Sequence, residues 1–184
     1  MGWSMDLRVA KGTRPLRRFF FGLWPDQSVR ENLVCSTKET VQVSGGRAVA
    51  AENLHITVAF LGSINKAQLR KVRAVPPVTA SKFVITLDTL HFHRSSRMLW
   101  LVPREIPVEL VLLRQSLWDG LEQAGCKREH RPYRPHLTLA RRSQIVREVV
   151  KPVVWPVTKL ALLESVLAPK GVSYEVAQTW RLGE

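Results

Sequence analysis

The chain has 184 residues, two of them cysteine, and carries 28 Lys and Arg against 15 Asp and Glu, a net charge of +13. This length suits one domain or two small lobes that share a core, and two thiols give no disulfide framework. The apolar stretch Leu160–Ala168 is too short to span a membrane and is broken by Glu164, and Met1–Arg18 lacks the pattern of an export signal. We therefore expect a cytoplasmic protein with no membrane partner.

The first elements of the chain have clear local signals. Phe19–Leu23 predicts a short aromatic strand. Asp26 follows it and is a residue type that caps helices, so a helix is expected there. The apolar residues predicted for one side of this helix are Val29, Leu33 and Val34.

A second strand and a second helix come next. Leu54–Leu61 is rich in β-branched and apolar residues and is closed by Gly62, which favours a buried strand. Asn65 then predicts the cap of a helix that Pro76 and Pro77 would end. The residues spaced for one face of this helix are Leu69, Val72 and Val75.

The middle of the chain predicts a hairpin and a longer helix. The extended stretches Lys82–Leu90 and Met98–Val102 flank the polar run His93-Arg94-Ser95-Ser96, which reads as a turn. Val108–Ala124 has leucines at helical spacing, and Gly125 stands where a helix would end. Those leucines are Leu110, Leu113, Leu117 and Leu121.

The last third predicts strands only. His136–Ala140 is a strand, and Leu160–Leu167 with Val172–Thr179 predicts a closing hairpin across Pro169-Lys170-Gly171. A helix, a His-x-Thr strand and a hairpin thus occur in both halves of the chain. This partial repeat predicts an α+β fold with two similar lobes that face each other.

Two tetrapeptides of the pattern His-apolar-Thr-apolar start at His55 and at His136, 81 residues apart. Alternate residues of a strand share a face, so each strand presents an imidazole and a hydroxyl together, backed by apolar residues. One such strand is ordinary, because a single strand histidine is usually structural. Two matching copies indicate a paired function.

Phosphodiester cleavage gives a chemical reason for two histidines. It needs a base for the attacking oxygen and an acid for the leaving oxygen, on opposite sides of phosphorus. Histidine, with a pKa near ~6.5, can do either task. The hydroxyls of Thr57 and Thr138 can hydrogen-bond the phosphate, and a nearby arginine can neutralise its charge. This scheme needs no metal or other cofactor.

Basic residues gather around the second motif, with Glu129 opposing them: Lys127, Arg128, Arg131, Arg134, Arg141 and Arg142. Such a cluster favours phosphate-bearing partners, and a solvated surface that aids solubility is the alternative. Among the aromatic residues, Phe20, Trp100 and Tyr133 could stack on an RNA base, although core packing explains Phe20 and Trp100 equally well. His91 and His93 could bind substrate or metal, but their place beside a turn predicts a solvated pair.

The paired motifs resemble the signature of the two-histidine phosphoesterase superfamily. Three stretches together are similar to the bacterial RNA 2′,3′-cyclic phosphodiesterases, once described as 2′-5′ RNA ligases: Arg18-Phe-Phe-Phe-Gly-Leu-Trp-Pro-Asp, Glu52-Asn-Leu-His-Ile-Thr-Val-Ala-Phe-Leu-Gly and Arg134-Pro-His-Leu-Thr-Leu-Ala-Arg. The similarity covers about residues 17 to 180. It implies a bilobal, LigT-like α+β fold, in which two antiparallel sheets with helices outside surround a central cleft.

The resemblance also implies a reaction and roles. His55 would be the general acid and His136 the general base, while Thr57, Thr138 and Arg141 would hold the phosphate. The implied reaction is hydrolysis of a terminal 2′,3′-cyclic phosphate on RNA to a 2′-phosphomonoester, with the 3′-oxygen leaving. The reverse reaction, 2′-5′ ligation, stays open.

Further substrate contacts are predicted for Arg134, Tyr133 and Phe20. Residues 1–17 would form a basic extension, and residues 18–184 a single bilobal domain. We expect a monomer whose partner is RNA with a 2′,3′-cyclic phosphate end.

Two other classes of function remain open from the sequence. A module that binds phosphorylated RNA ends without turnover would find one of the two histidines dispensable. A phosphodiesterase for a small cyclic nucleotide or an ADP-ribose cyclic phosphate would keep both histidines but would not need the basic rim at Arg134–Arg142.

Overall fold

The computed structural model describes residues 17–75, 80–168 and 171–183. The predicted extension therefore lies outside the described residues, apart from Arg17. In chain order the elements are β1 (Arg17–Leu23), α1 (Gln27–Val43), β2 (Arg47–Ala48), the short 3₁₀ helix η1 (Ala51–Asn53), β3 (Ile56–Ile64), α2 (Lys66–Arg73), β4 (Phe83–Leu87), β5 (Thr89–His93), β6 (Met98–Val102), α3 (Val108–Gln123), β7 (Leu137–Arg141), β8 (Val153–Val157), β9 (Lys159–Ala168) and β10 (Gly171–Arg181).

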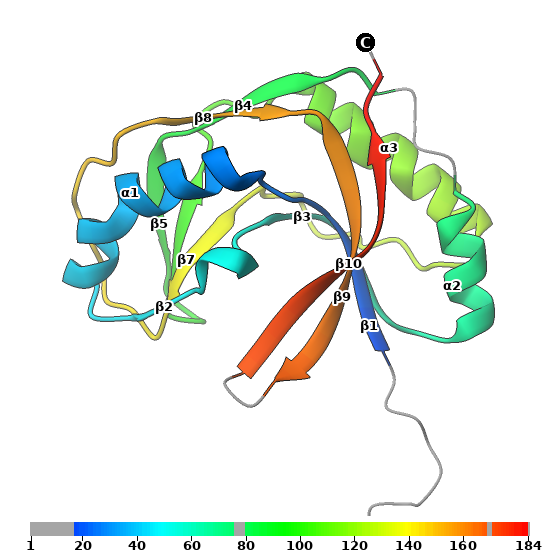
Figure 1. Cartoon of the computed structure of the whole chain (residues 1–184), viewed down its shortest axis with the longest axis horizontal. Helices are drawn as coiled ribbons and strands as arrows, with labels where there is room; N and C mark the ends of the chain where they lie inside the picture. Colours follow the sequence, from blue (N-terminus) through cyan, green and yellow to red (C-terminus); the bar gives the residue numbers. More distant parts are fainter. Residues whose placement is uncertain (1–16, 76–79, 169–170, 184) are drawn as a thin grey trace, which may run out of the picture.

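Eight strands form one large sheet in the order β10-β9-β1-β3-β7-β6-β5, with β2 paired to β7, and β4 and β8 form a separate two-stranded sheet. Every strand pairing is antiparallel. The two halves of the large sheet join between β3 and β7, where Ile56 pairs with Leu137. Figure 1 shows α1 beside the β7 half and α2 and α3 beside the β3 half. The predicted α+β class is confirmed.

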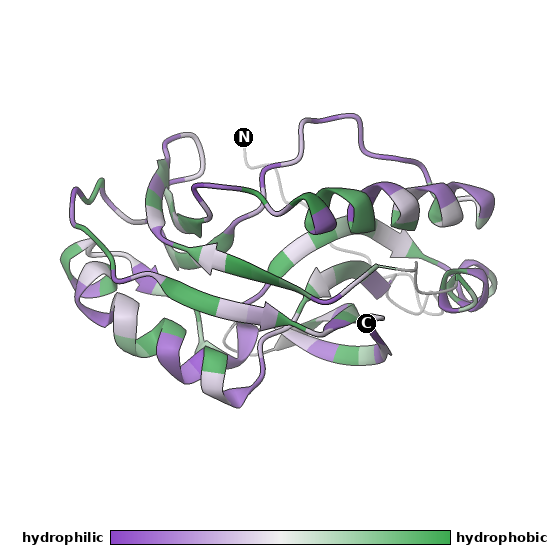
Figure 2. Cartoon of the chain, turned by 90° about the horizontal axis from the view of Figure 1, so that it is seen from above, coloured by the Kyte–Doolittle hydropathy of each residue, from purple (hydrophilic) through white to green (hydrophobic). Residues whose placement is uncertain are grey.

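The two faces of the large sheet have different roles. Phe19, Phe21 and Ile56 belong to the main hydrophobic core, which also takes in the apolar sides of the three α-helices and of the β4–β8 sheet. Phe20 belongs instead to a small cluster with Ala161 and Leu163. Figure 2 shows hydrophobic residues along the strands and hydrophilic residues alternating with them on the helices. Because successive strand residues point to opposite faces, both His-x-Thr pairs belong to the face away from the main core.

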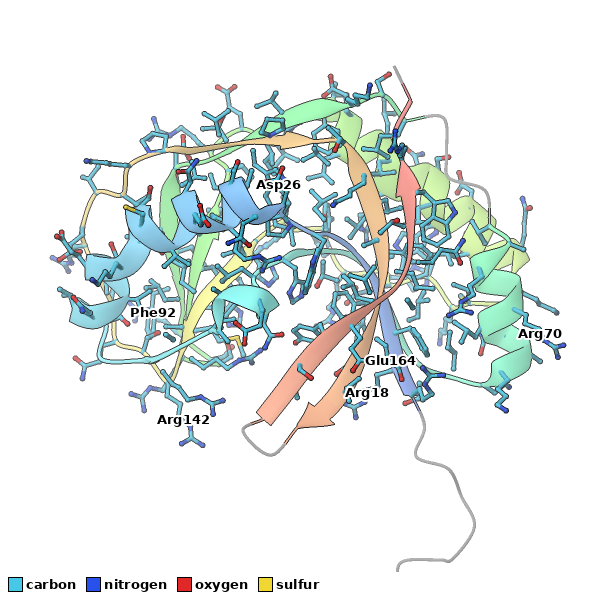
Figure 3. The ribbon with its side chains drawn as sticks, viewed as in Figure 1. Arg18, Asp26, Arg70, Phe92, Arg142 and Glu164 are labelled. Carbon is cyan, nitrogen blue, oxygen red and sulfur yellow. The ribbon has the colours of Figure 1, made fainter. Side chains whose placement is uncertain are left out.

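The helices begin where the sequence predicts. The Asp26 carboxylate accepts a 2.9 Å hydrogen bond from the Val29 amide at the start of α1 (Figure 3), and Asn65 does the same for Gln68 in α2. The four predicted leucines of α3 are buried, and Gly125 follows the helix with φ +83°. Val34 is a correction: it is 42% exposed, because it lies one residue round the helix from buried Leu33.

The predicted hairpin in the middle of the chain is half right. β5 pairs with β6 as expected, but Phe83–Leu87 forms β4, which pairs with β8 about 70 residues later in the chain. Asp88 separates β4 from β5; its carboxylate accepts hydrogen bonds from the Thr89 hydroxyl at 2.9 Å and the Arg104 amide at 3.0 Å. No local pattern of residues pointed to β8 as the partner.

Two further predictions concern the end of β3 and the hairpin that closes the chain. Gly62 does not close β3, which continues to Ile64; Gly62 has φ +66° and lies at a shift in the β1–β3 register, where a glycine tolerates the left-handed backbone. The closing hairpin is confirmed as β9 and β10, with residues 169–170 outside the described residues. Pro76 and Pro77, predicted to end α2, also lie outside them.

Candidate active site

The strand register brings the two motifs together. Ile56 and Leu137 are directly opposite each other, and in an antiparallel pair the residue before one strand position faces the residue after the other. Continued by one residue on each side, this register would set His55 across from Thr138 and Thr57 across from His136; Thr57 and His136 line one pocket, and the charge of His136 acts on His55. Cβ atoms of such cross-strand neighbours lie about 4.5–5.5 Å apart. Two imidazoles and two hydroxyls from distant parts of the chain therefore share one small area of the sheet.

Each histidine is anchored in the same way. Nδ1 of His55 lies 2.7 Å from the carbonyl oxygen of Asn53, and Nδ1 of His136 lies 2.7 Å from that of Arg134. A carbonyl oxygen only accepts hydrogen bonds, so Nδ1 carries the proton in both rings. Nε2 is then the nitrogen that can take or give a proton, in both halves of the site.

Aromatic rings surround His55. The ring centroids of Phe20 and Tyr174 lie 5.1 Å apart, and they lie 4.9 Å and 4.7 Å from the imidazole, with that of Trp24 at 6.2 Å. Phe20 is only 3% exposed, so its ring has no open face for an RNA base. The structure thus replaces the stacking role predicted for Phe20 with packing against His55.

Burial sets the protonation state of both histidines. It lowers the pKa of His55 to about 4, and the charges of His136, Arg141 and Arg30 act in the same direction, against the Asn53 hydrogen bond. Burial also lowers the pKa of His136, with His93 and His91 adding to the effect and the Arg134 carbonyl opposing it. Both rings are therefore neutral at pH 7 in the free protein, and a bound anion would favour their charged forms.

A pocket of about 460 Å³ opens beside His136. Pockets for small ligands commonly have volumes of about 300–1,000 Å³, so its size suits a nucleotide. It holds four of the predicted site residues together with residues that the sequence did not single out. The lining is Thr57, Val58, Phe60, His93, Trp100, Arg114, Glu129, Arg131, Pro132, Tyr133, Arg134 and His136.

Tyr133 ties this pocket to β3. Its hydroxyl donates a 3.1 Å hydrogen bond to the carbonyl oxygen of Thr57, and the Arg114 guanidinium lies 4.6 Å from the ring centroid. Burial raises the pKa of Tyr133, so the phenol stays protonated. Tyr133 lines the pocket as predicted, but Arg114 occupies one face of its ring.

A second pocket, of about 340 Å³, opens on the His55 side. Arg141 lies here, opposite Arg47 in the β2–β7 pairing, and not in the pocket that holds Arg134. Asn53 and Tyr174, which both contact His55, also line it. The two pockets thus adjoin different histidines, and each carries arginines.

Several residues of the site escaped the sequence analysis. His93 was expected to be solvated, but it is half-buried and its ring lies 4.3 Å from that of Trp100, inside the pocket of His136. Phe60 is 51% exposed and lines the same pocket. The alternation along β5 places His91 and His93 on one face, which is a signal that the sequence offers for His93. Only the pairing of β5 with β6 shows that this face is the one that carries His136.

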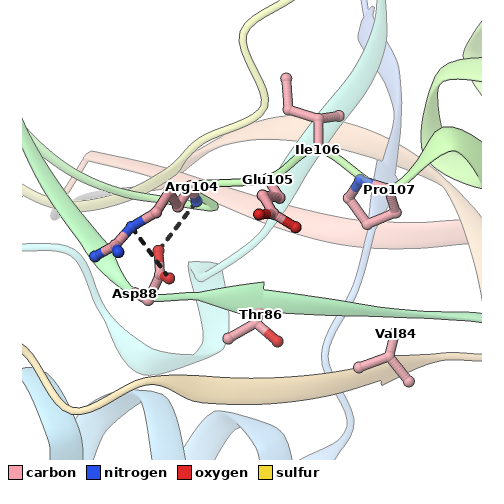
Figure 4. Close-up of a pocket in the computed structure, with 7 residues that line it drawn as sticks. All are labelled: Val84, Thr86, Asp88, Arg104, Glu105, Ile106 and Pro107. Atoms are coloured by element: carbon pink, nitrogen blue, oxygen red, sulfur yellow. Dashed lines mark hydrogen bonds and ion pairs between the residues drawn. The ribbon is translucent and has the colours of Figure 1, made fainter.

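Other features of the described residues lie apart from this site. A pocket of about 470 Å³ beside Asp88, Arg104 and Thr86 contains none of the predicted residues (Figure 4). No three His, Cys, Asp or Glu side chains come together as metal ligands within residues 17–75, 80–168 and 171–183. In the same part of the chain, no helix is long and apolar enough to cross a membrane.

The chain is similar in sequence and fold to known proteins. The family model of the 2′-5′ RNA ligase superfamily matches residues 26–167. The chain is 30% identical to the RNA 2′,3′-cyclic phosphodiesterase of Archaeoglobus fulgidus over 86% of this chain and 96% of that protein, and 29% identical to that of Escherichia coli over 90% and 97%. The crystal structure of Escherichia coli LigT complexed with 3′-AMP matches with a TM-score of 0.83 and 28% identity, covering 92% of this chain and 99% of LigT.

Proposed function

Because the chain belongs to the 2′-5′ RNA ligase superfamily, we propose that it is an RNA 2′,3′-cyclic phosphodiesterase that hydrolyses the terminal cyclic phosphate to a 2′-phosphomonoester. Relatives with 27% to 30% identity over most of the chain carry that name. The observation that supports the proposal most is the register at Ile56 and Leu137, because it gives one phosphate two imidazoles and two hydroxyls.

In the proposed reaction the cyclic phosphate binds between the two histidines. The hydroxyls of Thr57 and Thr138 donate hydrogen bonds to its non-bridging oxygens, and Arg141 neutralises its charge. Nε2 of His136 takes a proton from water, whose oxygen bonds to phosphorus opposite O3′. The P–O3′ bond breaks as Nε2 of His55 donates a proton to O3′, so the phosphate remains on O2′. Proton exchange with solvent then restores both rings.

The protonation states fit these roles once substrate is present. His136 is neutral in the free protein, as a base must be. His55 is also neutral at pH 7, but the negative phosphate placed beside it favours the imidazolium that an acid must be. Substrate binding therefore charges the acid, and each proton transfer contributes about 10²–10⁴-fold to the rate.

The same groups would catalyse 2′-5′ ligation if a 5′-hydroxyl of RNA replaced the water. The attacking oxygen arrives on the side of the base, and the pocket of about 460 Å³ adjoins His136. That pocket is large enough for a nucleoside, whereas hydrolysis by water does not need a space of this size. We include the ligation in the proposal on this ground.

The test is incubation of the protein with an oligonucleotide that ends in a 2′,3′-cyclic phosphate, followed by identification of the product terminus by ³¹P NMR. We expect a 2′-phosphomonoester, formed about 10²-fold or more slowly by His55→Gln or His136→Gln. A 3′-phosphate product would show that O2′, and not O3′, is the leaving group. Binding without turnover would leave a module for phosphorylated RNA ends, and equal kcat/KM for a cyclic mononucleotide would point to small nucleotides.

A further inference from the structure

The ring of the proposed base, His136, is the first of three stacked rings, and His91 also stacks on the middle one at 5.6 Å. The centroids of Trp100 and His136 lie 3.9 Å apart with the planes at 25°, and those of Trp100 and His93 lie 4.3 Å apart at 22°. Trp100 is on β6, which lies between β5 and β7 in the sheet. His93 ends β5 and His136 directly precedes β7, so the indole is stacked between the two imidazoles.

The other contacts of His136 leave one motion free. Its Nδ1 bonds to the Arg134 carbonyl, which holds the side chain at one ring atom and leaves χ1 and χ2 free to change together. Such a change would move Nε2, and the Trp100 ring, whose centroid lies 3.9 Å away, stands against it. His55 differs, because three aromatic rings lie around it.

The indole is not held by its own polar group. Nε1 of Trp100 is buried and has no hydrogen-bond partner among the residues that the structure describes. A buried donor without a partner destabilises a fold, so phenylalanine would serve folding at least as well here. What tryptophan adds at this position is ring area over His136. His93 closes the outer side of the stack and is fixed by a 2.7 Å contact between its Nδ1 and the Ser96 hydroxyl.

We propose that Trp100, backed by His93, is a positioning residue that holds the imidazole of His136 in the orientation needed for catalysis. The proposal rests on the proposed function of His136 as the base. It assigns a role to two residues that contact the proposed base, and both also line the pocket beside it. Loss of the stack should lower kcat, measured at saturating substrate so that a change in KM does not enter.

The experiment compares Trp100→Leu and Trp100→Phe with Trp118→Phe as the matched control. Trp118 is a buried core residue of α3 whose Nε1 also lacks a partner among the described residues. We expect Trp100→Leu to lower kcat by about 10²-fold, because small misplacements of a catalytic group cost that much. Trp100→Phe should restore most of this rate, with a Tm no lower than wild type. Trp118→Phe should lower Tm, because at 0% exposure the smaller ring leaves a cavity in the core, and it should leave kcat unchanged.

Two results would overturn the proposal. One is a folded Trp100→Leu with a kcat within twofold of wild type. The other, decisive if the leucine variant fails to fold, is a Trp100→Phe that has a normal Tm but loses kcat about 10²-fold, because its ring would still cover His136. A measurement that needs no substrate tests this proposal independently of the proposed phosphodiesterase activity. The ¹H NMR signals of the His136 ring carry the ring-current shift of Trp100, and Trp100→Leu should move them toward free-histidine values. Unmoved signals would refute the stack even in an active enzyme, and moved signals would support it even if cyclic-phosphate RNA is no substrate.

Discussion

Ile56 of β3 lies opposite Leu137 of β7, and this pair joins the two halves of the large sheet. Both side chains are fully buried in the main core. The histidine that precedes each of them is thereby turned to the opposite face, toward its counterpart. A slip of one residue would put one histidine into the core, so hydrophobic packing fixes the relative position of the two histidines proposed for catalysis.

Activity should fall steadily as pH rises above neutrality. The active form needs one charged and one neutral imidazole, and kcat/KM reports these groups in the free enzyme. Because both pKa values are lowered from about 6.5, the active form becomes rarer as pH rises above that value. We expect kcat/KM to fall by about tenfold per unit between pH 7 and 8. A plateau through pH 8 would contradict this.

Stability should fall on the acid side for a related reason. Folded His55 has a pKa of about 4, whereas the unfolded side chain titrates near ~6.5. Between these values the unfolded state binds more protons, so the free energy of unfolding decreases as pH falls from ~6.5 toward 4. Urea unfolding at pH 7 and pH 5 should show a smaller decrease in His55→Gln than in wild type. His130→Gln, at an exposed residue, is the control, and an equal decrease in all three proteins would refute the effect.

Arginines of the two pockets should act differently on long and short substrates. Arg141→Ala should slow every substrate, because it removes a charge beside the reacting phosphate. Arg131→Ala with Arg134→Ala should reduce kcat/KM for an oligonucleotide more than for a cyclic mononucleotide, and the difference should fade with salt. Arg70→Ala, at an exposed position on α2 (Figure 3), is the control for loss of positive charge.

If the oligonucleotide has no advantage over the mononucleotide at low salt, the basic residues around the second motif serve solubility. The proposal that RNA is the substrate would then rest on family membership alone.

Chelation should leave the reaction unchanged. The proposed acid and base are histidines paired with threonines, which form a poor closed site for a metal ion. Turnover in excess EDTA should equal that in buffer, after dialysis of the protein against chelator. A loss that one divalent ion restores would point to a metallo-phosphodiesterase, with His91 and His93 as the first ligands to substitute.

The sequence predicted those parts of the structure that rest on local signals. Asp26 and Asn65 cap their helices, and the leucines of α3 face the core, because caps and helical spacing involve residues close in the chain. The two His-x-Thr motifs could be identified because each consists of four consecutive residues. The catalytic roles of His55 and His136 stay predictions that only experiment can test.

Features that depend on distant partners were missed. β4 was joined to the wrong hairpin because its partner β8 lies far along the chain. His93 and Trp100 looked ordinary because only the order β5-β6-β7 lines them up with His136. Phe20 has the residue type for stacking on a base, but the neighbouring strands bury it against His55.

The most direct test of the central claim, that two histidines act as one unit on one phosphate, is the kcat of His55→Gln, His136→Gln and the double variant on a 2′,3′-cyclic-phosphate oligonucleotide. Each single variant should lose about 10²-fold or more. The double variant should lose little beyond the worse single one, because residues that act as a unit are not additive. Near-normal turnover in either single variant, in a protein that unfolds like wild type, would contradict the account.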